Sequence, residues 1–600
     1  MFPYLTEVKN PSKKYIVSFK GINYGEGTQD GEFAETYNLS TDQYPCITQR
    51  AARIPKQEYN IPSTLHSKGK LLVIAKHPEK DNVSNVYYGE EIVGEIPSGK
   101  KQTATIGNYI VIFPDKMYYK VPTEDEEGKY GSMEEKHTES RLKFTKSAIS
   151  TVVSYDIPSY RFISTSTIIS KLGSYTFNTF KAGDIVKIEG CARENNNKSE
   201  ITIREVTSDA LIFDENSFTT YSPTSATLTI TLIKREFPFK EGDAVTITGC
   251  SKSENNKKEE ILIRGVSEDK CELTFDENAF TEATESGDVT ISRTVPDLDF
   301  ICESNYRLWG THGNTIYSSK FSDPFNFKVF DNLATDSYAI EVGSEGEFTG
   351  CIPYSSHICF FKENTLHKLY GTKPSNFQIT TVNVYGVQSG SERSMQIVNE
   401  QLLYKGVGGV YAYTGGVPEL ISEKFGNNRY SDAVACCDGE KYYISMKRGD
   451  EWHMFAYDVL KNIWLREDDT HAVDMTFFDG YIYYLDSRGT LYYIDKTADR
   501  SDIEWGATFC TMHETINERK GYSKFHMRLD LSAGAWLAVD VKTDNDLKWK
   551  QVYTTHNEKA KTVGIPIIPT RCDSIDIRLR GKGKCTVKAF IREFTVGSDV

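Results

Sequence analysis

The segment whose spacing comes nearest to known chemistry is Gly94-Glu-Ile-Pro-Ser-Gly99-Lys100-Lys101, which has the glycine and lysine spacing of a phosphate-binding Walker A loop. Such a loop needs a Ser or Thr hydroxyl after its lysine to hold magnesium, and Lys101 stands at that position. It also needs a helix after the loop, whereas both flanks have the pattern of hairpin strands. We therefore interpret this segment as a turn and not as a nucleotide site.

Two further patterns could suggest a ligand loop. Gly406-Val-Gly408-Gly409 has no strand-helix-strand context and connects two short aromatic runs, so its glycines favour close strand packing or a bulge. Asp486-Ser-Arg-Gly489-Thr490 resembles the Asp-box of sialidase propellers, but the aromatic partner of that box and its repetition are missing. We interpret both patterns as structural turns.

Signatures of catalysis and of metal binding are otherwise missing. The eleven histidines include no pair four residues apart, and no Gly-x-Ser-x-Gly elbow marks a serine hydrolase. The twelve cysteines lie at irregular spacings without a Cys-x-x-Cys, so we interpret them as buried free thiols. Among 84 acidic residues some carboxylates will always lie near one another, so a carboxylate pair does not indicate a glycosidase unless the distance between the two groups is known. We predict no catalytic, cofactor-binding or metal-binding residues, and a protein that is not an enzyme.

The charge and hydropathy of the chain restrict its partners. A net charge of −14, spread along the chain, argues against a clustered basic surface for nucleic acid. The mean hydropathy of −0.46 is typical of a protein that folds in water. No stretch approaches the roughly 18 apolar residues of a spanning helix, and the N-terminus lacks the apolar core of a signal peptide. We therefore expect folding in a cytoplasm and no membrane span.

Short apolar and aromatic runs separated by Gly, Asn and Asp turns predict an all-β fold. These runs belong to a larger unit whose copies begin near residues 64, 102, 298, 357, 400, 441 and 477. Units of about 30 to 45 residues with four short strands are typical of β-propeller blades, which close into a circle because no blade can bury both faces alone. We predict about seven blades, with six or eight as alternatives.

An internal duplication interrupts the blade pattern. Residues 180–219 and 239–281 share F-K-x-G-D-x-V-x-I-x-G-C and F-D-E-N-x-F-T. Each copy alternates apolar and polar residues over five short runs, which predicts a small β-barrel or sandwich that resembles an SH3-like barrel. The Asn-Asn-Lys turns at 194–198 and 254–257 are expected to be exposed tips, because Asn accepts turn geometry and Lys stays solvated. We expect the whole interruption to project from the propeller.

After residue 500, longer alternating strands predict a C-terminal β-sandwich. The predicted divisions are an N-terminal segment with the first blades (1–121), a connecting excursion (122–177), β module 1 (178–235), β module 2 (236–296), the remaining blades (297–500) and the sandwich (501–600).

Three segments resemble a family of tailed-bacteriophage propeller proteins. The stretch 305–327 contains R-L-W-x-x-x-x-N-x-I-Y followed by S-x-x-x-D-P-x-N-F, which resembles a blade strand and turn of that family. Residues 38–50 near the start and 592–599 at the end look like the same family. Its members are packaged-DNA stabilisation, nozzle or tail-hub proteins, found below the portal of the virion.

The resemblance implies a structural virion protein, assembled in the host cytoplasm, that forms a homo-oligomeric ring, commonly of six copies. Its implied partners are the portal or adaptor, other tail proteins and passing DNA, which it would contact without reading sequence. An acidic ring suits that role, because carboxylates let DNA slide where a basic surface would hold it. A short-tailed nozzle and a long-tail component both remain open. The alternatives are a receptor- or glycan-binding propeller and a sialidase-like hydrolase.

Overall fold

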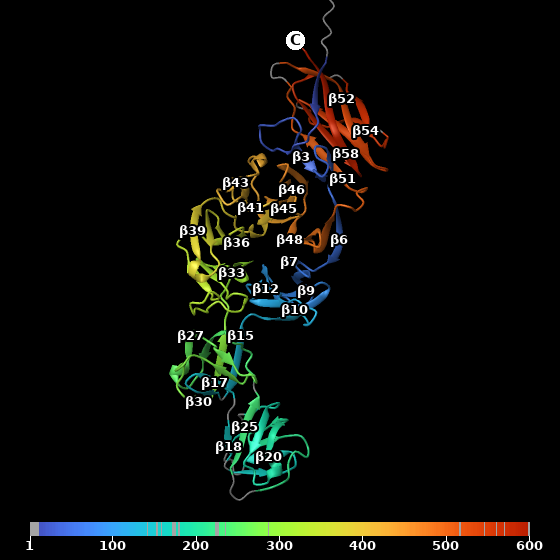
Figure 1. Ribbon diagram of the computed structural model, residues 1–600. Helices are drawn as coiled ribbons and strands as arrows, with labels where there is room; N and C mark the ends of the chain where they lie inside the picture. The colour runs from blue at the N-terminus through green and yellow to red at the C-terminus, as the bar shows by residue number, and fades with distance from the viewer. Residues whose placement is uncertain are drawn as a thin grey trace, which may run out of the picture.

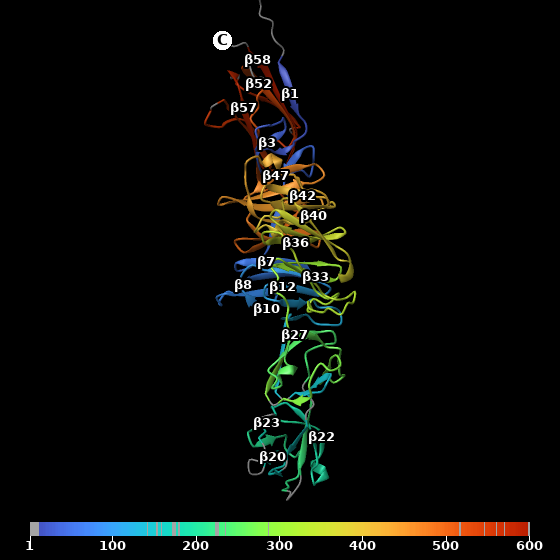
Figure 2. The same cartoon turned by 90° about the vertical axis from the view of Figure 1, so that its left-hand side faces the viewer.

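The computed structural model describes residues 11–597 except 141, 152–153, 158, 171–175, 178–179, 223–226, 235, 286, 515–517, 545, 560 and 569–570. The chain forms parts stacked along one long axis (Figure 1). A two-sheet unit at one end, here the terminal unit, contains both the first and the last strands. A ring of sheets lies in the middle, and two small modules extend from its far side, as the rotated view also shows (Figure 2).

Seven four-stranded antiparallel sheets make up the ring in the described part of the chain. From the innermost strand outward, the first four sheets are β7 (Pro62–Lys68), β8 (Lys70–Lys76), β9 (Val83–Tyr88) and β10 (Glu91–Pro97); β11 (Gln102–Ile106), β12 (Tyr109–Phe113), β13 (Met117–Lys120) and β14 (Lys129–Ser132); β32 (Phe300–Ser304), β33 (Arg307–His312), β34 (Thr315–Ser318) and β35 (Tyr338–Glu341); β36 (Phe348–Tyr354), β37 (His357–Lys362), β38 (Thr365–Tyr370) and β39 (Gln378–Asn383).

The other three sheets are β40 (Gln396–Val398), β41 (Gln401–Gly406), β42 (Gly409–Tyr413) and β43 (Glu419–Leu420); β44 (Ser431–Cys437), β45 (Lys441–Arg448), β46 (Glu451–Asp458) and β47 (Ile463–Asp468); β48 (Ala472–Phe478), β49 (Tyr481–Asp486), β50 (Thr490–Asp495) and β6 (Ala52–Glu58). The all-β prediction is thus confirmed, and the four-stranded sheets are consistent with β-propeller blades.

Hydrophobic clusters between successive sheets hold the ring together. Strands such as β8 and β12 are continuous apolar runs because both of their faces are covered by neighbouring sheets. The cluster that closes the circle packs Leu65 and Val73 of the first sheet against Tyr483 and Leu485 of the seventh. Closure is also made by the main chain, because β6 precedes the first sheet in sequence yet pairs with β50.

The two modules are nested, one within the other. The proximal module lies next to the ring and has two sheets. Its first sheet contains, in spatial order, β15 (Glu135–Ser140), β31 (Asp288–Arg293), β26 (Ala244–Thr248) and β27 (Lys257–Leu262). Its second sheet contains β28 (Gly265–Val266), β29 (Glu272–Thr274), β17 (Ala148–Ser150), β16 (Lys143–Phe144) and β30 (Ala283–Thr284). The distal module also has two sheets. The first contains β18 (Ser154–Ile157), β25 (Leu228–Lys234), β21 (Ile185–Glu189) and β22 (Lys198–Thr202). The second contains β19 (Tyr160–Phe162), β20 (Thr167–Ser170), β24 (Ala210–Ile212) and β23 (Glu205–Val206). Each module has its own apolar core.

The expected connecting excursion at 122–177 is therefore replaced by strands. Its first part completes the second ring sheet through β14, its middle part gives β15 to β17 to the proximal module, and the described residues of its last part give β18 to β20 to the distal module. The distal module is inserted between β17 and β26 of the proximal one. The predicted boundary at 177/178 divides the distal module, because β18 to β20 share sheets with later strands of that module. The boundary at 235/236 matches the end of the distal module after β25, but residues 236–296 form the proximal module only together with β15 to β17.

The Asn-Asn-Lys turns are short 3₁₀ turns, Glu194–Asn196 and Ser253–Asn255, and not simple exposed tips. Their flanks are exposed, but Asn196 and Asn255 are completely buried. The Asn196 amide donates to the Thr219 carbonyl and its oxygen accepts from the Thr219 amide, both at 2.8 Å. Asn255 makes the same pair with Thr281. The repeated Asn thus joins two loops in each module.

The terminal unit draws strands from both ends of the described chain. One sheet contains β1 (Ser12–Ile16), β4 (Leu39–Ser40), β5 (Ile47–Gln49), β58 (Cys585–Val596), β52 (Lys520–Leu531), β55 (Thr562–Pro566) and β56 (Arg571–Cys572). The other contains β2 (Gly21–Ile22), β3 (Glu32–Tyr37), β51 (Glu504–Phe509), β57 (Ile575–Lys582), β53 (Trp536–Thr543) and β54 (Lys550–Thr555). The two sheets share one apolar core.

The N-terminal segment expected with the first blades therefore belongs largely to the terminal unit, up to Gln49. Its pairing is non-local, as in the register of Ser12 with Phe594.

The remaining short 3₁₀ turns are Pro374–Asn376, Glu392–Ser394 and Glu423–Phe425. None of the helices in the described part of the chain has the length and apolar character of a membrane-crossing helix.

Candidate functional site: a central cavity and three junctions

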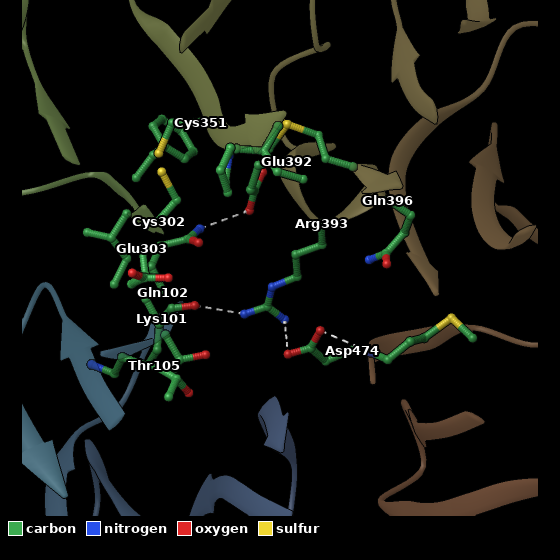
Figure 3. Close-up of a pocket in the computed structure, with 18 of the residues that line it drawn as sticks. Lys101, Gln102, Thr105, Cys302, Glu303, Cys351, Glu392, Arg393, Gln396 and Asp474 are labelled. Carbon is green, nitrogen blue, oxygen red and sulfur yellow. Dashed lines mark hydrogen bonds and ion pairs between the residues drawn. The ribbon is translucent and has the colours of Figure 1, made fainter. Parts of the chain in front are cut away.

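The innermost strands of all seven ring sheets surround a central cavity of about 350 Å³ (Figure 3). Each sheet supplies at least one lining residue: Leu65, Thr103, Cys302, Cys351, Gln396, Ala435 and Asp474. The volume lies at the lower end of the roughly 300 to 1,000 Å³ typical of small-molecule sites. The charged residues within it decide what the cavity can do.

Arg393, in the turn Glu392–Ser394, extends across the cavity and bonds to three parts of the ring. Its guanidinium donates to the carbonyls of Ser63 at 2.9 Å, Lys101 at 2.8 Å and Val473 at 3.1 Å. It also forms an ion pair with Asp474 at 3.2 Å. The guanidinium of Arg393 thus cross-links the first and seventh sheets and the residue that precedes the second sheet, Lys101.

Two carboxylates complete the network in the cavity. Asp474 accepts from the amides of Leu65 at 2.8 Å and Met475 at 2.9 Å. Burial raises the pKa of Asp474, and Arg393 opposes that shift. Glu392 forms an ion pair with Lys100 and accepts from the Gln102 amide at 3.3 Å. Both carboxylates are engaged by protein groups, an arrangement suited to cross-linking more than to acid-base chemistry.

The Walker-like segment ends at the edge of this network. Lys100 pairs with Glu392, and the buried Lys101 pairs with Asp115 at 2.6 Å. The backbone before these lysines is strand β10 and a short turn, with β11 after them. Both ammonium groups therefore neutralise carboxylates of the ring and are not directed at a phosphate loop.

The other two patterns are tight turns. A Cβ at Gly406 would lie 2.7 Å from the Gly386 carbonyl, so this glycine permits close backbone contact. Gly489 has φ +104°, and a Cβ there would lie 2.2 Å from the Tyr59 carbonyl. Asp486 accepts from its neighbour Ser487 at 3.2 Å and belongs to the same turn. The twelve cysteines are free thiols, and the described residues contain no group of three or more side chains able to hold a metal ion.

The motif segment 305–327 lies at the junction between the ring and the proximal module. Arg307 is buried and donates to the carbonyls of Ser319 and Ala334, each at 2.8 Å, which holds the loop after β34 in place. Asn326, in that loop, donates to Asp243 of the proximal module at 2.9 Å and accepts from the Ala244 amide at 3.1 Å. The motif therefore connects two folded parts.

Arg293 completes this junction from the module side. It pairs with Asp243 at 2.8 Å, and its guanidinium lies 5.4 Å from the centre of the Phe325 ring. Asp243 is completely buried and Asn326 almost so. A buried carboxylate is tolerated only when it is paired and hydrogen-bonded, so each member of the set depends on the others.

The segment 38–50 lies at the second junction, between the ring and the terminal unit. The Asn38 side chain donates to the Glu504 carbonyl of β51 at 2.7 Å, while its main-chain amide donates to the Glu467 carbonyl of β47 at 2.6 Å. Arg50 donates to the Asn38 side chain at 2.6 Å and lies 3.6 Å from Asp468. Asn38 has a left-handed φ of 55°, which Asn tolerates better than most residues.

The segment 592–599 is described up to residue 597 and supplies the third junction. Arg592, which is completely buried, donates to Glu514 at 2.7 Å and to Asp30 at 2.8 Å. Lys14 pairs with Glu514 from the N-terminal strand at 2.9 Å. Burial alone would raise the pKa of Glu514, but Arg592 and Lys14 hold it below its ordinary value. This network joins the two ends of the chain.

Sequence reasoning singled out the three junction segments, but it did not single out Asp243, Arg293 or Arg393. Asp243 had a signal, because the Gly-Asp of the duplicated segments is shared by both copies. Arg393 had none, because it lies in a short polar stretch between two blade patterns. Its role follows only from the circular arrangement of the sheets.

No protein-family model matches the sequence, and no curated protein matches it. Among solved structures, the chain is similar to BamB from Moraxella catarrhalis, at 9% identity over 75% of this chain and 99% of that chain, with a TM-score of 0.29. It is also similar to the extracellular domain of the one-component system BT4673 from B. thetaiotaomicron, at 8% identity over 93% of this chain and 94% of that one, with a TM-score of 0.21. Hsv2 from Kluyvelomyces marxianus matches at 11% identity over 38% of this chain and 66% of its own, with a TM-score of 0.23. These proteins are β-propellers, and the similarity to them concerns the fold and not the function.

Proposed function

We propose that the chain is a structural virion protein of a tailed bacteriophage, which forms a hub or nozzle ring below the portal or adaptor. In this proposal the ring of sheets is a seven-bladed propeller, the nested modules are small β-barrels and the terminal unit is a β-sandwich. The assembled protein stabilises packaged DNA and forms part of the ejection channel. It acts in the virion and has no catalytic role.

One observation carries the proposal: the three segments that resemble the phage family all lie at junctions between parts of the chain. Arg307 and Asn326 connect the ring to the proximal module, Asn38 and Arg50 connect it to the terminal unit, and Arg592 joins the chain ends. Residues of this kind maintain the shape of a long molecule. A structural subunit of a tail would need such a fixed shape.

The channel of the proposed assembly lies between copies of the chain. The cavity within one ring holds only about 350 Å³ and is crossed by Arg393, so it offers no path for a duplex. With a net charge of −14, several copies around a common axis would give that channel an acidic wall on which DNA slides. Each specific contact between copies should bury on the order of 800 Å² per partner.

The test is reconstitution with portal and adaptor proteins, followed by electron microscopy and native mass spectrometry. The proposal expects a closed ring, most simply of six copies, stacked on the portal, and no hydrolase or ATP-binding activity. The isolated chain should bind duplex DNA weakly and without a steep salt dependence. Failure to bind the portal or adaptor, or tight salt-sensitive DNA binding, would contradict it.

A receptor- or glycan-binding propeller is the second candidate, favoured by one surface hollow. Phe477 and Tyr481 are exposed and line a hollow of about 360 Å³ together with Asp479 and Asp495. Aromatic faces beside carboxylates can stack on and hydrogen-bond to a sugar. A glycan array would test this candidate, with Tyr481→Ala as the variant that should lose any signal.

A further inference from the structure

A second, smaller cavity lies between the fifth and sixth ring sheets and has a volume of about 220 Å³. Its walls come from the β41–β42 turn, the turn Glu423–Phe425 and the approach to β44. Phe425 and Tyr430 form an apolar floor. The Gly408–Gly409 turn forms another wall, and a Cβ at Gly409 would lie 2.4 Å from the Ser422 hydroxyl. None of the residues that line the central cavity takes part.

The unusual residue here is Lys405, which is only 1% exposed. Its ammonium donates to the Gln388 side chain at 2.7 Å and to the Gly406 carbonyl at 2.5 Å. Both acceptors are neutral, and in the described part of the chain no carboxylate lies within ion-pair distance of it. Of the other buried lysines, Lys101, Lys441 and Lys520 have a carboxylate partner, whereas Lys362 and Lys368 donate to neutral oxygens. A buried cation without a counter-ion is costly.

A second cation lies at the mouth of the cavity. Arg429 lines it and is exposed, and among the residues that the structure describes it donates only to the carbonyls of Gly426 at 3.2 Å and Asn428 at 3.4 Å. Arg448 lies behind Asn428 and donates to its side chain at 3.2 Å. Burial, and to a smaller extent the positive charge of Arg429, lowers the pKa of Lys405 from 10.5 to about 8, as expected for a buried cation near a second cation. Only Glu423, an exposed residue on the rim, has the opposite charge.

We propose that this cavity binds a small oxyanion, either a carboxylate or a phosphate group, between Lys405 and Arg429. The anion supplies the charge that Lys405 lacks, and the planar guanidinium of Arg429 can hold two oxygens of such a group. The oxyanion comes either from a free small molecule or from a carboxylate of another protein chain. The site goes beyond the proposed structural role and does not depend on it.

Binding is measured by isothermal titration calorimetry on the full chain, with inorganic phosphate, acetate and a capped Gly-Glu-Gly peptide as probes. Chloride at equal ionic strength is the background. We expect saturable binding of at least one probe, weakened at least tenfold by Arg429→Gln and lost in Lys405→Met. Binding of phosphate or acetate identifies a free anion as sufficient, whereas binding of the peptide alone identifies a protein carboxylate.

Two further variants separate a binding site from general charge effects. Glu423→Gln removes the single rim carboxylate and should strengthen binding several-fold, which a purely structural role would not produce. Arg488→Gln changes an exposed arginine in the β49–β50 turn, far from the cavity, and should leave binding unchanged. If Lys405→Met does not fold, the effects of Arg429→Gln and Glu423→Gln on anion binding still test the proposed site. The proposal is overturned if no probe binds saturably, or if binding is the same in Arg429→Gln as in the unmodified chain.

Discussion

Asn326 in the ring and Asp243 in the proximal module share a buried hydrogen bond of 2.9 Å across 83 residues of sequence. Asp243 is also paired with Arg293 of the same module. The distal module repeats the aspartate as Asp184, but strand register places Leu232 where the proximal module has Arg293. The ring junction is therefore specific to the proximal copy, although both modules derive from one duplicated sequence.

Replacing Asn326 with Ala should loosen the proximal module from the ring. The substitution leaves an oxygen of Asp243 and the Ala244 amide without their partner, at a cost of roughly 1 to 3 kcal/mol. Hydrogen exchange at the Ala244 amide should accelerate while exchange in the core strands of the ring stays slow. Asn60→Ala removes an exposed side chain with one long hydrogen bond and serves as the control. Unchanged exchange at Ala244 would show that the junction does not depend on Asn326.

Replacing Arg393 with Met should destabilise the ring as a whole. The change removes one cation that bonds to three parts of the ring and leaves the buried Asp474 without its ion pair. Removing one partner of a buried pair costs about 3 to 5 kcal/mol. The midpoint of thermal unfolding should fall clearly, and adding Asp474→Leu should restore part of the loss, because the second change removes the uncompensated carboxylate. A midpoint unaltered by Arg393→Met would mean that the central network contributes little to stability.

Acid should weaken the contact between the first two ring sheets through His66. This half-buried ring lies 2.7 Å from the Thr105 hydroxyl and 3.1 Å from that of Thr103. Burial, and then Lys68, lowers its pKa from 6.5 to about 4. The unfolded chain therefore takes up the proton first, so the stability present above pH 6.5 is lost as the pH falls from 6.5 towards 4.

The expected loss is roughly 1 to 2 kcal/mol, below the full linkage value because the side chain is partly exposed. His66→Gln keeps a polar group at this site and should flatten the fall in unfolding midpoint between pH 6.5 and 4. His556→Gln, at an exposed histidine, should not alter it. An equally steep fall in His66→Gln would assign the acid sensitivity to other groups, such as the buried His367.

Local patterns predicted the parts of the fold that depend on local pairing. The blade strands, such as β8 and β12, could be located because each is a short apolar run that pairs with its sequence neighbours. The early strands of each module could not be located, because residues 142–149 and 160–168 share only three identical positions: Phe144 with Phe162, Ser147 with Ser166, and Ile149 with Ile168. No local pattern can predict the pairing of Ser12 with Phe594, because these residues lie near opposite ends of the chain. The role of Arg393 could not be predicted either, because its partners come together only when the sheets form a ring (Figure 3).

The nested arrangement decides where the modules can be removed. Replacing residues 134–294 with a short Gly/Ser linker should leave a folded ring, because the strands that begin and end this segment are paired, Glu135 opposite Arg293. Ends that lie side by side cost the host fold only loop-closure entropy. Replacing 150–294 should do worse, since it leaves Leu142, Phe144 and Ile149 without the core that buries them. Circular dichroism, trypsin resistance and the unfolding midpoint compare the two deletions. If the chain lacking 134–294 unfolds while the chain lacking 150–294 does not, the proximal module is part of the ring and the nested arrangement is wrong.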